Sequence, residues 1–337
     1  MWRYIARRVA VMPFLLLGIV TLSFIVSRAI PADPLVTLVG DRQLNNPEVV
    51  AAAKERWGLD RSGFEQYLIY VRNLARGDMG TSFRTRASVG HDLSQRFPAT
   101  LELTIAAMVL GTVGGLSLGV LAAKRQNRGT DHAARLFALT GSSIPVFWAG
   151  LVLLFVFYAQ LGWLPGPGRL DPRAIAPPRH TGLYTIDALI AGDWATLRDA
   201  LWHLLLPAFV LGWGVMGIVS RLVRASMLDE LGTDYVRTAR AKGLRERNVL
   251  VGHALRNALL PTLTIIGFSF AYLITGAVLT ETIFSWPGVG SYAVDAARSL
   301  DFPAIMGVSI LGGFVFLLAN LITDLAYAVV DPKIRLS

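Results

Sequence analysis

The sequence lacks cysteine altogether and has few charged residues. Among its 337 residues there is no Cys, which excludes disulfide scaffolds, thiolate metal sites and thiol nucleophiles. Charged residues make up 16% and apolar residues 53% of the chain, whereas a soluble domain has about 25% and about 45 to 50%. Together with a mean hydropathy of +0.51, this composition indicates a protein that crosses a membrane several times.

Motifs of common nucleotide and metal sites are also missing. The sequence contains neither the phosphate-binding pattern G-x-x-x-x-G-K-[ST] nor the zinc pattern H-E-x-x-H. Its histidines are far apart and lack the spacing of metal ligands: His91, His132, His180, His203 and His253. We therefore predict no catalytic residue, no metal site, no cofactor bound by this chain and no enzymatic activity.

Six charge-free apolar runs have the length of a membrane span. A bilayer core about 30 Å thick needs about 20 helical residues, and lipid offers no partner to a free backbone amide or carbonyl. The runs are Val9 to Val26, Leu103 to Ala123, Leu136 to Leu164, Ala200 to Ser220, Ala258 to Thr280 and Ala304 to Thr323. The predicted fold is all-α with six transmembrane helices. The third helix should end near Gln160, and Pro13, Pro145 and Pro207 should kink three of the helices.

Basic residues gather on one side of the predicted spans. They precede the first span, join the second to the third and the fourth to the fifth, and follow the sixth. By the positive-inside rule both termini face the cytoplasm, and the net charge of +9 reflects membrane loops rather than nucleic-acid binding. We predict an N-terminal part, 1–97, with an uncleaved anchor helix and an external subdomain that has short helices at 47–57 and 64–74. Residues 98–337 form a core of five spans.

The cytoplasmic connection at 221–257 has the pattern of a helical hairpin. Thr233 can cap a helix over 234–241, Gly243 permits a turn, and Arg245 to Ala254 predicts a second short helix. Close to the membrane and exposed at its tip, such a hairpin has the form of a lever against which a partner docks. A basic stretch that binds anionic lipid explains the composition equally well.

Ionisable residues within the spans are few. Glu102 stands at the start of the second span, where the helix dipole favours a carboxylate, and Glu281 closes the fifth at the external interface, solvated or paired. Asp324 lies in the sixth span and must face the protein interior or a partner, with a structural role favoured over a transport role. A proton-coupled carrier normally needs carboxylates near the midplane, and these spans offer none. Small residues at four-residue spacing in the second span predict close helix packing: Gly111, Gly115 and Gly119.

Seven motifs, in order, point to a known family. They are Tyr4-Ile5-Ala6-Arg7-Arg8, Pro31-Ala32-Asp33-Pro34, Gly77-Asp78-Met79-Gly80-Thr81-Ser82, Arg96-Phe97-Pro98-Ala99-Thr100-Leu101-Glu102, Asp234-Tyr235-Val236-Arg237-Thr238-Ala239-Arg240-Ala241-Lys242-Gly243, Phe284-Ser285-Trp286-Pro287-Gly288-Val289-Gly290 and Asp324-Leu325-Ala326-Tyr327 with Asp331-Pro332-Lys333-Ile334-Arg335. Over nearly its whole length the chain resembles permease subunits of ABC importers, in the branch that takes up dipeptides, oligopeptides and sometimes nickel. The resemblance implies the transmembrane domain of a type I importer in the bacterial plasma (inner) membrane.

The resemblance also implies site residues. The cytoplasmic segment would be a coupling helix that sits in a groove of an ATPase subunit, where small side chains let it sink in while Arg240 and Lys242 meet acidic groups. Its expected coupling residues are Arg237, Ala239, Arg240, Ala241, Lys242, Gly243 and Leu244. The external segment expected to face a binding protein contains Trp286, Pro287, Gly288 and Gly290.

The implied partners are a second homologous permease subunit in a heterodimer, two ABC ATPase subunits that carry ATP and Mg, and an extracytoplasmic solute-binding protein. Membrane lipid surrounds the chain, and nucleic acid is not expected. The expected function is ATP-driven import of peptides. Nickel or another small solute carried by the same mechanism is the alternative; an ion-coupled secondary transporter, an exporter and an intramembrane enzyme are further, less favoured ones.

Overall fold

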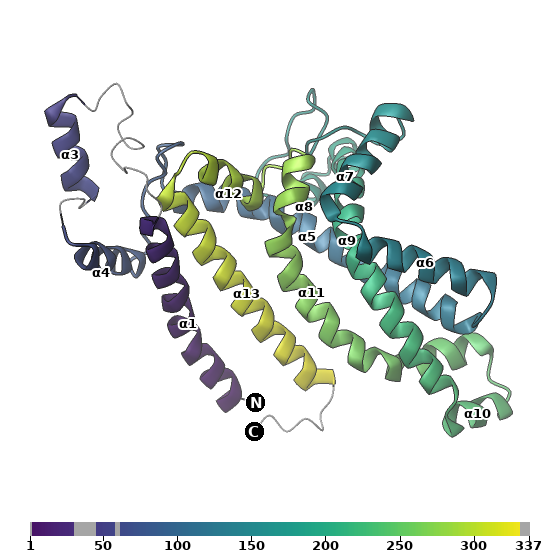
Figure 1. Ribbon diagram of the computed structural model, residues 1–337. Helices are drawn as coiled ribbons and strands as arrows, with labels where there is room; N and C mark the ends of the chain where they lie inside the picture. Colours follow the sequence, from purple (N-terminus) through teal and green to yellow (C-terminus); the bar gives the residue numbers. More distant parts are fainter. Residues whose placement is uncertain (1, 30–44, 58–60, 331–337) are drawn as a thin grey trace. The chain divides into compact units, whose positions relative to one another are not determined.

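The computed structural model describes residues 2–29, 45–57 and 61–330 (Figure 1). Within these residues the regular elements are helices, and the only strand-like feature is a single bridge between Thr81 and Ser88. The predicted all-α fold is therefore confirmed. The motif at 31–34 and the one at 331–335 lie outside the described residues.

The helices follow one another with few long connections. In chain order they are α1 (Trp2–Ala29), α3 (Pro47–Trp57), α4 (Gly63–Leu74), α5 (Val89–Lys124), α6 (Gly129–Ser143), α7 (Val146–Leu154), η1 (Phe155–Gln160), α8 (Tyr184–Ile190), α9 (Trp194–Leu231), α10 (Asp234–Ala241), η2 (Asn248–Ala254), α11 (Leu255–Ile283), α12 (Val289–Arg298) and α13 (Phe302–Val330). Both short helices predicted for the external subdomain are present as α3 and α4.

Four helices are long and apolar enough to cross a membrane: α1, α5, α9 and α13. Two bent pairs pass the same test as broken spans. One pair is α6 with α7 and η1; the other joins η2 and the start of α11 to the rest of α11 across a bend of 56°. The described residues thus contain four to six candidate spans.

The run predicted as the third span is not one continuous helix. α6 ends at Ser143 and α7 begins at Val146, with a bend of 109° between the two segments. A residue before proline avoids the helical region, and Ile144, before Pro145, has φ −80° and ψ 132°. The predicted kink is therefore a full break, whereas the predicted helix end near Gln160 is confirmed by the end of η1.

Packing divides the chain into two compact units, one of 99–287 with 318–337 and one of 2–98 with 288–317. The sequence-based division into 1–97 and 98–337 stays a prediction. In the first unit α9 is the central helix, because α6, α8 and α11 all pack against it (Figure 1). Among the four continuous candidate spans, α9 is also the most buried.

Glycines permit the close packing of α9 against its neighbours. A Cβ added to Gly111 of α5 would lie 2.8 Å from the carbonyl oxygen of Gly212, and one added to Gly115 would lie 2.7 Å from Cβ of Val219. The same holds for Gly119, so the close packing predicted from all three glycines is confirmed. Toward α6, a Cβ added to Gly217 would lie 2.3 Å from the carbonyl oxygen of Ala138. The backbone of α9 thus approaches both α5 and α6.

The second unit packs around the first half of α13. Val89 and Leu93 of α5 join Tyr292 of α12 and Ala304 of α13 in one buried apolar cluster. α1 approaches α13 closely, since a Cβ added to Gly313 would lie 2.4 Å from a methyl carbon of Ile19.

The close approach of α5 to α9 predicts that Gly115→Ala lowers the free energy of unfolding by about 1 to 3 kcal/mol, through overpacking. The new Cβ would lie 2.7 Å from Cβ of Val219 and 2.9 Å from the carbonyl oxygen of Met216. Thermal unfolding of the purified chain in detergent micelles measures the change. Gly252→Ala is the control, because a Cβ there meets nothing within 4 Å. Equal stability of the two variants would contradict the packing.

Candidate functional site: an exposed basic hairpin and a buried polar cluster

The segment after α9 forms the predicted hairpin. Val236 and Ala239 of α10 are buried in the same apolar core as Val223 and Met227 of α9. Val249 of η2 belongs to this core as well. α10 is therefore fixed to the bundle along one side, and its other side is exposed (Figure 1).

Gly243 makes the turn that ends α10. Its φ is +74°, a left-handed conformation that glycine adopts without steric cost. The amide of Gly243 donates to the carbonyl of Arg240 at 2.9 Å, and the amide of Leu244 donates to the carbonyl of Ala239 at 3.3 Å. These two bonds define a Schellman motif. The predicted glycine turn is confirmed, but the predicted cap is not: the Thr233 side chain donates to the carbonyl of Glu230 instead of capping α10.

Ion pairs and hydrogen bonds brace the hairpin. Arg240 donates two hydrogen bonds to Glu246, with Nη2 to Oε1 at 2.9 Å and Nε to Oε2 at 3.3 Å. These bonds lower the pKa of Glu246 below its ordinary value, so the pair stays ionised through the neutral range. Tyr235 donates to Glu230 at the end of α9 and accepts from Nδ2 of Asn257 in α11 at 3.0 Å. Side-chain contacts therefore tie α10 to both helices that flank it.

The exposed residues of the predicted coupling set face away from the core. They are Arg237, Arg240, Ala241, Lys242, Gly243 and Leu244. Ala239 differs, because it is only 7% exposed and packs inside this chain. Its small side chain is explained by that internal packing, so the surface offered to another protein is formed by its neighbours.

The buried carboxylate of Asp131 fastens the loop that connects α5 to α6. Asp131, fully buried in the first turns of α6, accepts from Nε and Nη2 of Arg224 in α9, both at 2.7 Å. It also accepts from the backbone amide of Asn127 at 2.9 Å. Arg135 approaches it at 3.4 Å. Asp131 is thus paired with an arginine that is itself only partly buried, and only the fold brings the two residues together.

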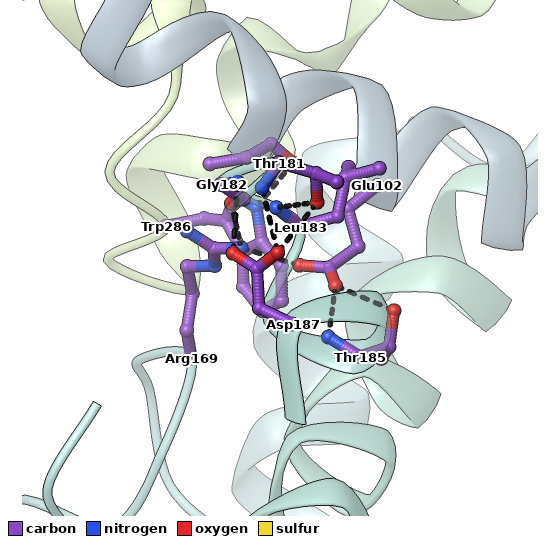
Figure 2. A network of polar contacts seen from close by, with 9 residues as sticks. Glu102, Arg169, Thr181, Gly182, Leu183, Thr185, Asp187 and Trp286 are labelled. Atoms are coloured by element: carbon purple, nitrogen blue, oxygen red, sulfur yellow. Dashed lines mark hydrogen bonds and ion pairs between the residues drawn. The ribbon is translucent and has the colours of Figure 1, made fainter. Parts of the chain in front are cut away.

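The other polar cluster centres on Glu102 (Figure 2). One oxygen of Glu102 accepts from Nη2 of Arg169 at 2.6 Å, and the other accepts from the amide and the hydroxyl of Thr185, both at 2.8 Å. Glu102 is 6% and Arg169 7% exposed. Arg169 stacks on Tyr184, with 3.5 Å from Cζ to the ring centroid, and lies 5.6 Å from the ring of Trp286. This cluster thus holds the loop between η1 and α8 against α5.

Asp187 of α8 shapes the same loop. It accepts hydrogen bonds from the amide and hydroxyl of Thr181 and from the amide of Gly182 at 2.7 to 2.8 Å (Figure 2). Burial by itself raises the pKa of Asp187, but these hydrogen bonds outweigh it and hold the pKa below its ordinary value. The carbonyl of Gly182 in turn accepts from Arg169 at 3.0 Å. Side-chain hydrogen bonds therefore hold this loop in one conformation.

The expectation for Glu102 was wrong in one respect. α5 begins at Val89, so Glu102 lies well inside the helix and the dipole of a first turn does not act on it. The buried ion pair with Arg169 explains this carboxylate instead. Glu281 is fully buried and accepts from the hydroxyl of Thr100 at 2.6 Å, which selects pairing over solvation. Asp324 lies in α13, and its side chain is outside the described part.

The residues expected to face a binding protein are mostly covered by their own unit. Trp286 is 1% exposed, and its indole donates to the carbonyl of Ala99 at 2.8 Å. In the second unit Gly288 and Gly290 are buried at the start of α12, whereas Pro287 is exposed. The motif at 284–290 thus has a clear packing role, and binding-protein contact stays a prediction.

The motif at 77–82 also has a structural explanation. Gly77 and Gly80 have φ of +84° and +88°. Ser82 donates to the buried Asp301 at 2.5 Å, and Asp301 also accepts from the amide of Ala304 in the first turn of α13. The turn is therefore tied to the start of that helix.

One sequence pattern that is typical of hydrolases, G-x-S-x-G, has a structural explanation in this chain. Gly115 to Gly119 matches G-x-S-x-G, which in hydrolases lies on a strand-to-helix turn. In this chain it lies inside α5, and the Ser117 hydroxyl donates to the carbonyl of Val113 at 2.7 Å. The pattern serves helix packing.

These features define a helical protein of the membrane with several candidate spans, a buried polar cluster near the start of its central helix and an exposed basic hairpin after its end. The family model described as "Binding-protein-dependent transport system inner membrane component" matches residues 115–336, and the one described as "Binding-prot-dependent transport system membrane comp, N-term" matches residues 1–104. The chain belongs to this family and is a multi-pass protein of the bacterial inner membrane. The family consists of transmembrane permease subunits of ABC transporters, which are not themselves the ATPase.

Similarity to individual relatives extends over nearly the whole chain. The chain is 42% identical over 333 residues to the probable D,D-dipeptide transport system permease protein DdpB of Escherichia coli K12, covering 99% of this chain and 97% of the relative. It is 43% identical over 335 residues to the di/tripeptide transport system permease protein DppB of Pseudomonas aeruginosa, covering 99% of both. It is 37% identical over 337 residues to the oligopeptide transport system permease protein AppB of Bacillus subtilis, covering 98% and 99%.

The buried pair predicts strong coupling between Glu102 and Arg169. Glu102→Gln should lower the free energy of unfolding by about 3 to 5 kcal/mol, because it leaves the buried guanidinium without a counter-charge. Adding Arg169→Gln should recover part of that loss. Thermal unfolding of the single and double variants in detergent gives the coupling energy, with exposed Arg173→Gln as the neutral control. Additive losses in the double variant would contradict the pairing.

Proposed function

We propose that the chain is a permease subunit of an ATP-driven importer of dipeptides or oligopeptides. The observation that carries this proposal is identity of 37 to 43% with peptide permeases over at least 98% of the chain. Specificity for one peptide resides mainly in the binding protein, because a pathway that held its cargo tightly would release it slowly.

The proposed topology has six spans with both termini in the cytoplasm. α1, α5, α9 and α13 are four of the spans, and the two bent helix pairs are the others. The basic segments at 124–135 and 221–256 then face the cytoplasm, as the positive-inside rule requires. α9 is about 57 Å long at 1.5 Å per residue, so the Glu102 cluster beside α8 lies near the external end and the hairpin near the cytoplasmic end.

In the proposed mechanism two ATPase subunits bind ATP and Mg and move the hairpin, and this chain hydrolyses no ATP. Arg237 on α10 and Lys242 at its C-terminal cap are exposed and offer cations to acidic groups of an ATPase groove. Because Val236 lies in the same core as Val223 of α9, a displacement of α10 is passed to the bundle. The bundle, paired with a second homologous permease subunit, then alternates between inward-open and outward-open states.

At the external end, the Glu102 cluster keeps the loop before α8 in one shape while the bundle moves. A binding protein that docks there meets an ordered surface, since Asp187 and Arg169 fix the loop through hydrogen bonds. Pro287 is the exposed residue of the predicted external set. We assign the docking of the solute-loaded binding protein to this end.

Coupling through the hairpin predicts that Gly243→Val reduces ATP-driven peptide uptake about tenfold. A β-branched residue at φ +74° is strained by about 1 to 2 kcal/mol, which unwinds the Schellman turn. Gly243→Asn should retain most uptake, because Asn tolerates the left-handed conformation. Uptake is measured with the complete transporter in proteoliposomes containing ATP. Gly129→Val is the control, at the exposed start of α6 where an added Cβ meets nothing within 4 Å; equal uptake by all variants would contradict coupling through α10.

The substrate proposal is tested with the intact transporter. Labelled dipeptide or oligopeptide should accumulate when ATP and the binding protein are present, and collapse of the proton gradient by an ionophore should leave the rate unchanged. Nickel uptake in place of peptide uptake would favour the alternative solute. Uptake that stops with the ionophore and persists without ATP would identify a secondary transporter and overturn the proposal.

A further inference from the structure

α4 lies beside the C-terminal end of α1 and is attached to it by two polar contacts. Tyr67 and Thr21 of α1 share a hydrogen bond of 2.7 Å; since the Thr21 hydroxyl donates to the carbonyl of Leu17, Tyr67 is the donor. Arg28 of α1 donates to Gln66. Phe24 of α1 packs edge-on to Tyr67, with 5.5 Å between ring centroids. Figure 1 shows α4 lying beside the C-terminal end of α1.

These contacts fix the depth of α4. Thr21 and Arg28 are seven residues apart, or about 10 Å along α1. Both lie in the candidate span Ala6–Arg28. α4 therefore lies beside the last two turns of the span and at the level of the membrane interface.

The same contacts show which side of α4 faces the bilayer centre. Tyr67 reaches the deeper residue and Gln66 the shallower one. At 100° per residue, Val71 and Phe64 lie about 40° and 60° from Tyr67, on the side away from Gln66, and Leu68 lies 100° from it. The side of α4 that faces the bilayer centre, here called the deep side, is thus apolar.

Two large side chains on this deep side are uncovered. Phe64 is 70% and Leu68 50% exposed. The neighbouring end of α1 is similarly exposed, at Leu22 by 64% and at Ile25 by 57%. Arg72 is also exposed; it lies about 40° from Leu68 but about 140° from Tyr67 and 120° from Gln66, and so faces away from α1. Ser62 and Glu65 form a capping box at the start of α4, so the helix is stabilised at its N-terminus.

We propose that α4 is an interfacial helix that inserts Phe64 and Leu68 into the acyl region of the outer leaflet, with Arg72 at the level of the phosphates. The occupant of this face is lipid, because the face continues the exposed apolar surface of a membrane span at the same depth. Tyr67 and Tyr70 lie at that interface, where aromatic side chains with a polar tip are favoured. The inference rests on the proposed topology, in which α1 crosses the membrane and ends outside.

The absence of cysteine makes the proposal directly testable. Phe64→Cys, Leu68→Cys and Arg72→Cys each receive a single nitroxide label, and the labelled chain is assembled with cysteine-free partner subunits. The complete transporter is reconstituted in vesicles of phosphatidylethanolamine and phosphatidylglycerol. Collisions of each label with oxygen, which dissolves in the acyl region, and with a water-soluble nickel chelate are measured by electron paramagnetic resonance.

At positions 64 and 68 the ratio of oxygen to nickel collisions should exceed that at position 72 several-fold. A ratio typical of water at both positions overturns the proposal. Labels shielded from both reagents also overturn it, because another subunit would then cover this face.

Phe14→Cys separates this failure from that of the topology. Phe14 lies near the middle of the α1 span and is 75% exposed. Its label should show the highest ratio of oxygen to nickel collisions. A water-like value at position 14 would refute the spanning of α1 itself, whereas a lipid-like value there with water-like values at 64 and 68 refutes only the insertion of α4.

Discussion

The close packing of α9 on its neighbours is the constraint on which the rest of the first unit depends. Inside a bilayer the hydrophobic effect does not drive helices together, so association relies on van der Waals contact at short range. Glycines permit this short distance between helix backbones: Gly111 and Gly115 of α5 lie against α9, and Gly217 of α9 lies against α6. Because α9 is held on these sides, its two ends become fixed points to which the loop with α8 and the hairpin are attached.

Charge pairs with a buried carboxylate stand near both ends of this packed region. Removing an ion from water costs several kcal/mol, which a partner and further hydrogen bonds offset. Asp131 has Arg224 and a backbone amide; Glu102 has Arg169 and Thr185. Each pair joins a chain reversal to a long helix, so it fixes the direction in which the connection leaves the bundle.

Much of the architecture was predictable because it is encoded locally. Charge-free runs located the candidate spans, though not the break in the third run, and Gly243 located the turn of the hairpin, since both depend on neighbouring residues only. The glycine repeat in α5 predicted a close contact but not its partner. Fold class and family were therefore accessible from the sequence, whereas the assembly of each site was not.

What the sequence did not reveal are pairings over long separations. Arg169 is 67 residues from Glu102, and Arg224 is 93 residues from Asp131, so no spacing rule connects them. Trp286 seemed suited to an exposed loop because of its neighbours Pro287 and Gly288. Its burial arises from a contact with Ala99, 187 residues earlier in the chain.

The coupling proposed for the hairpin depends on how α10 is attached to the bundle as much as on its exposed surface. A helix of eight residues is too short to be stable by itself. Val236 and Ala239 hold it to the core, and Tyr235 links it to both α9 and α11. Force applied to the exposed side of α10 is therefore carried by packed side chains into two candidate spans. η2, a π-helical turn between the hairpin and α11, is where this path passes through the least regular backbone. In the proposed mechanism a displacement of α10 reaches α11 through this turn, ahead of the 56° bend between Leu259 and Pro261.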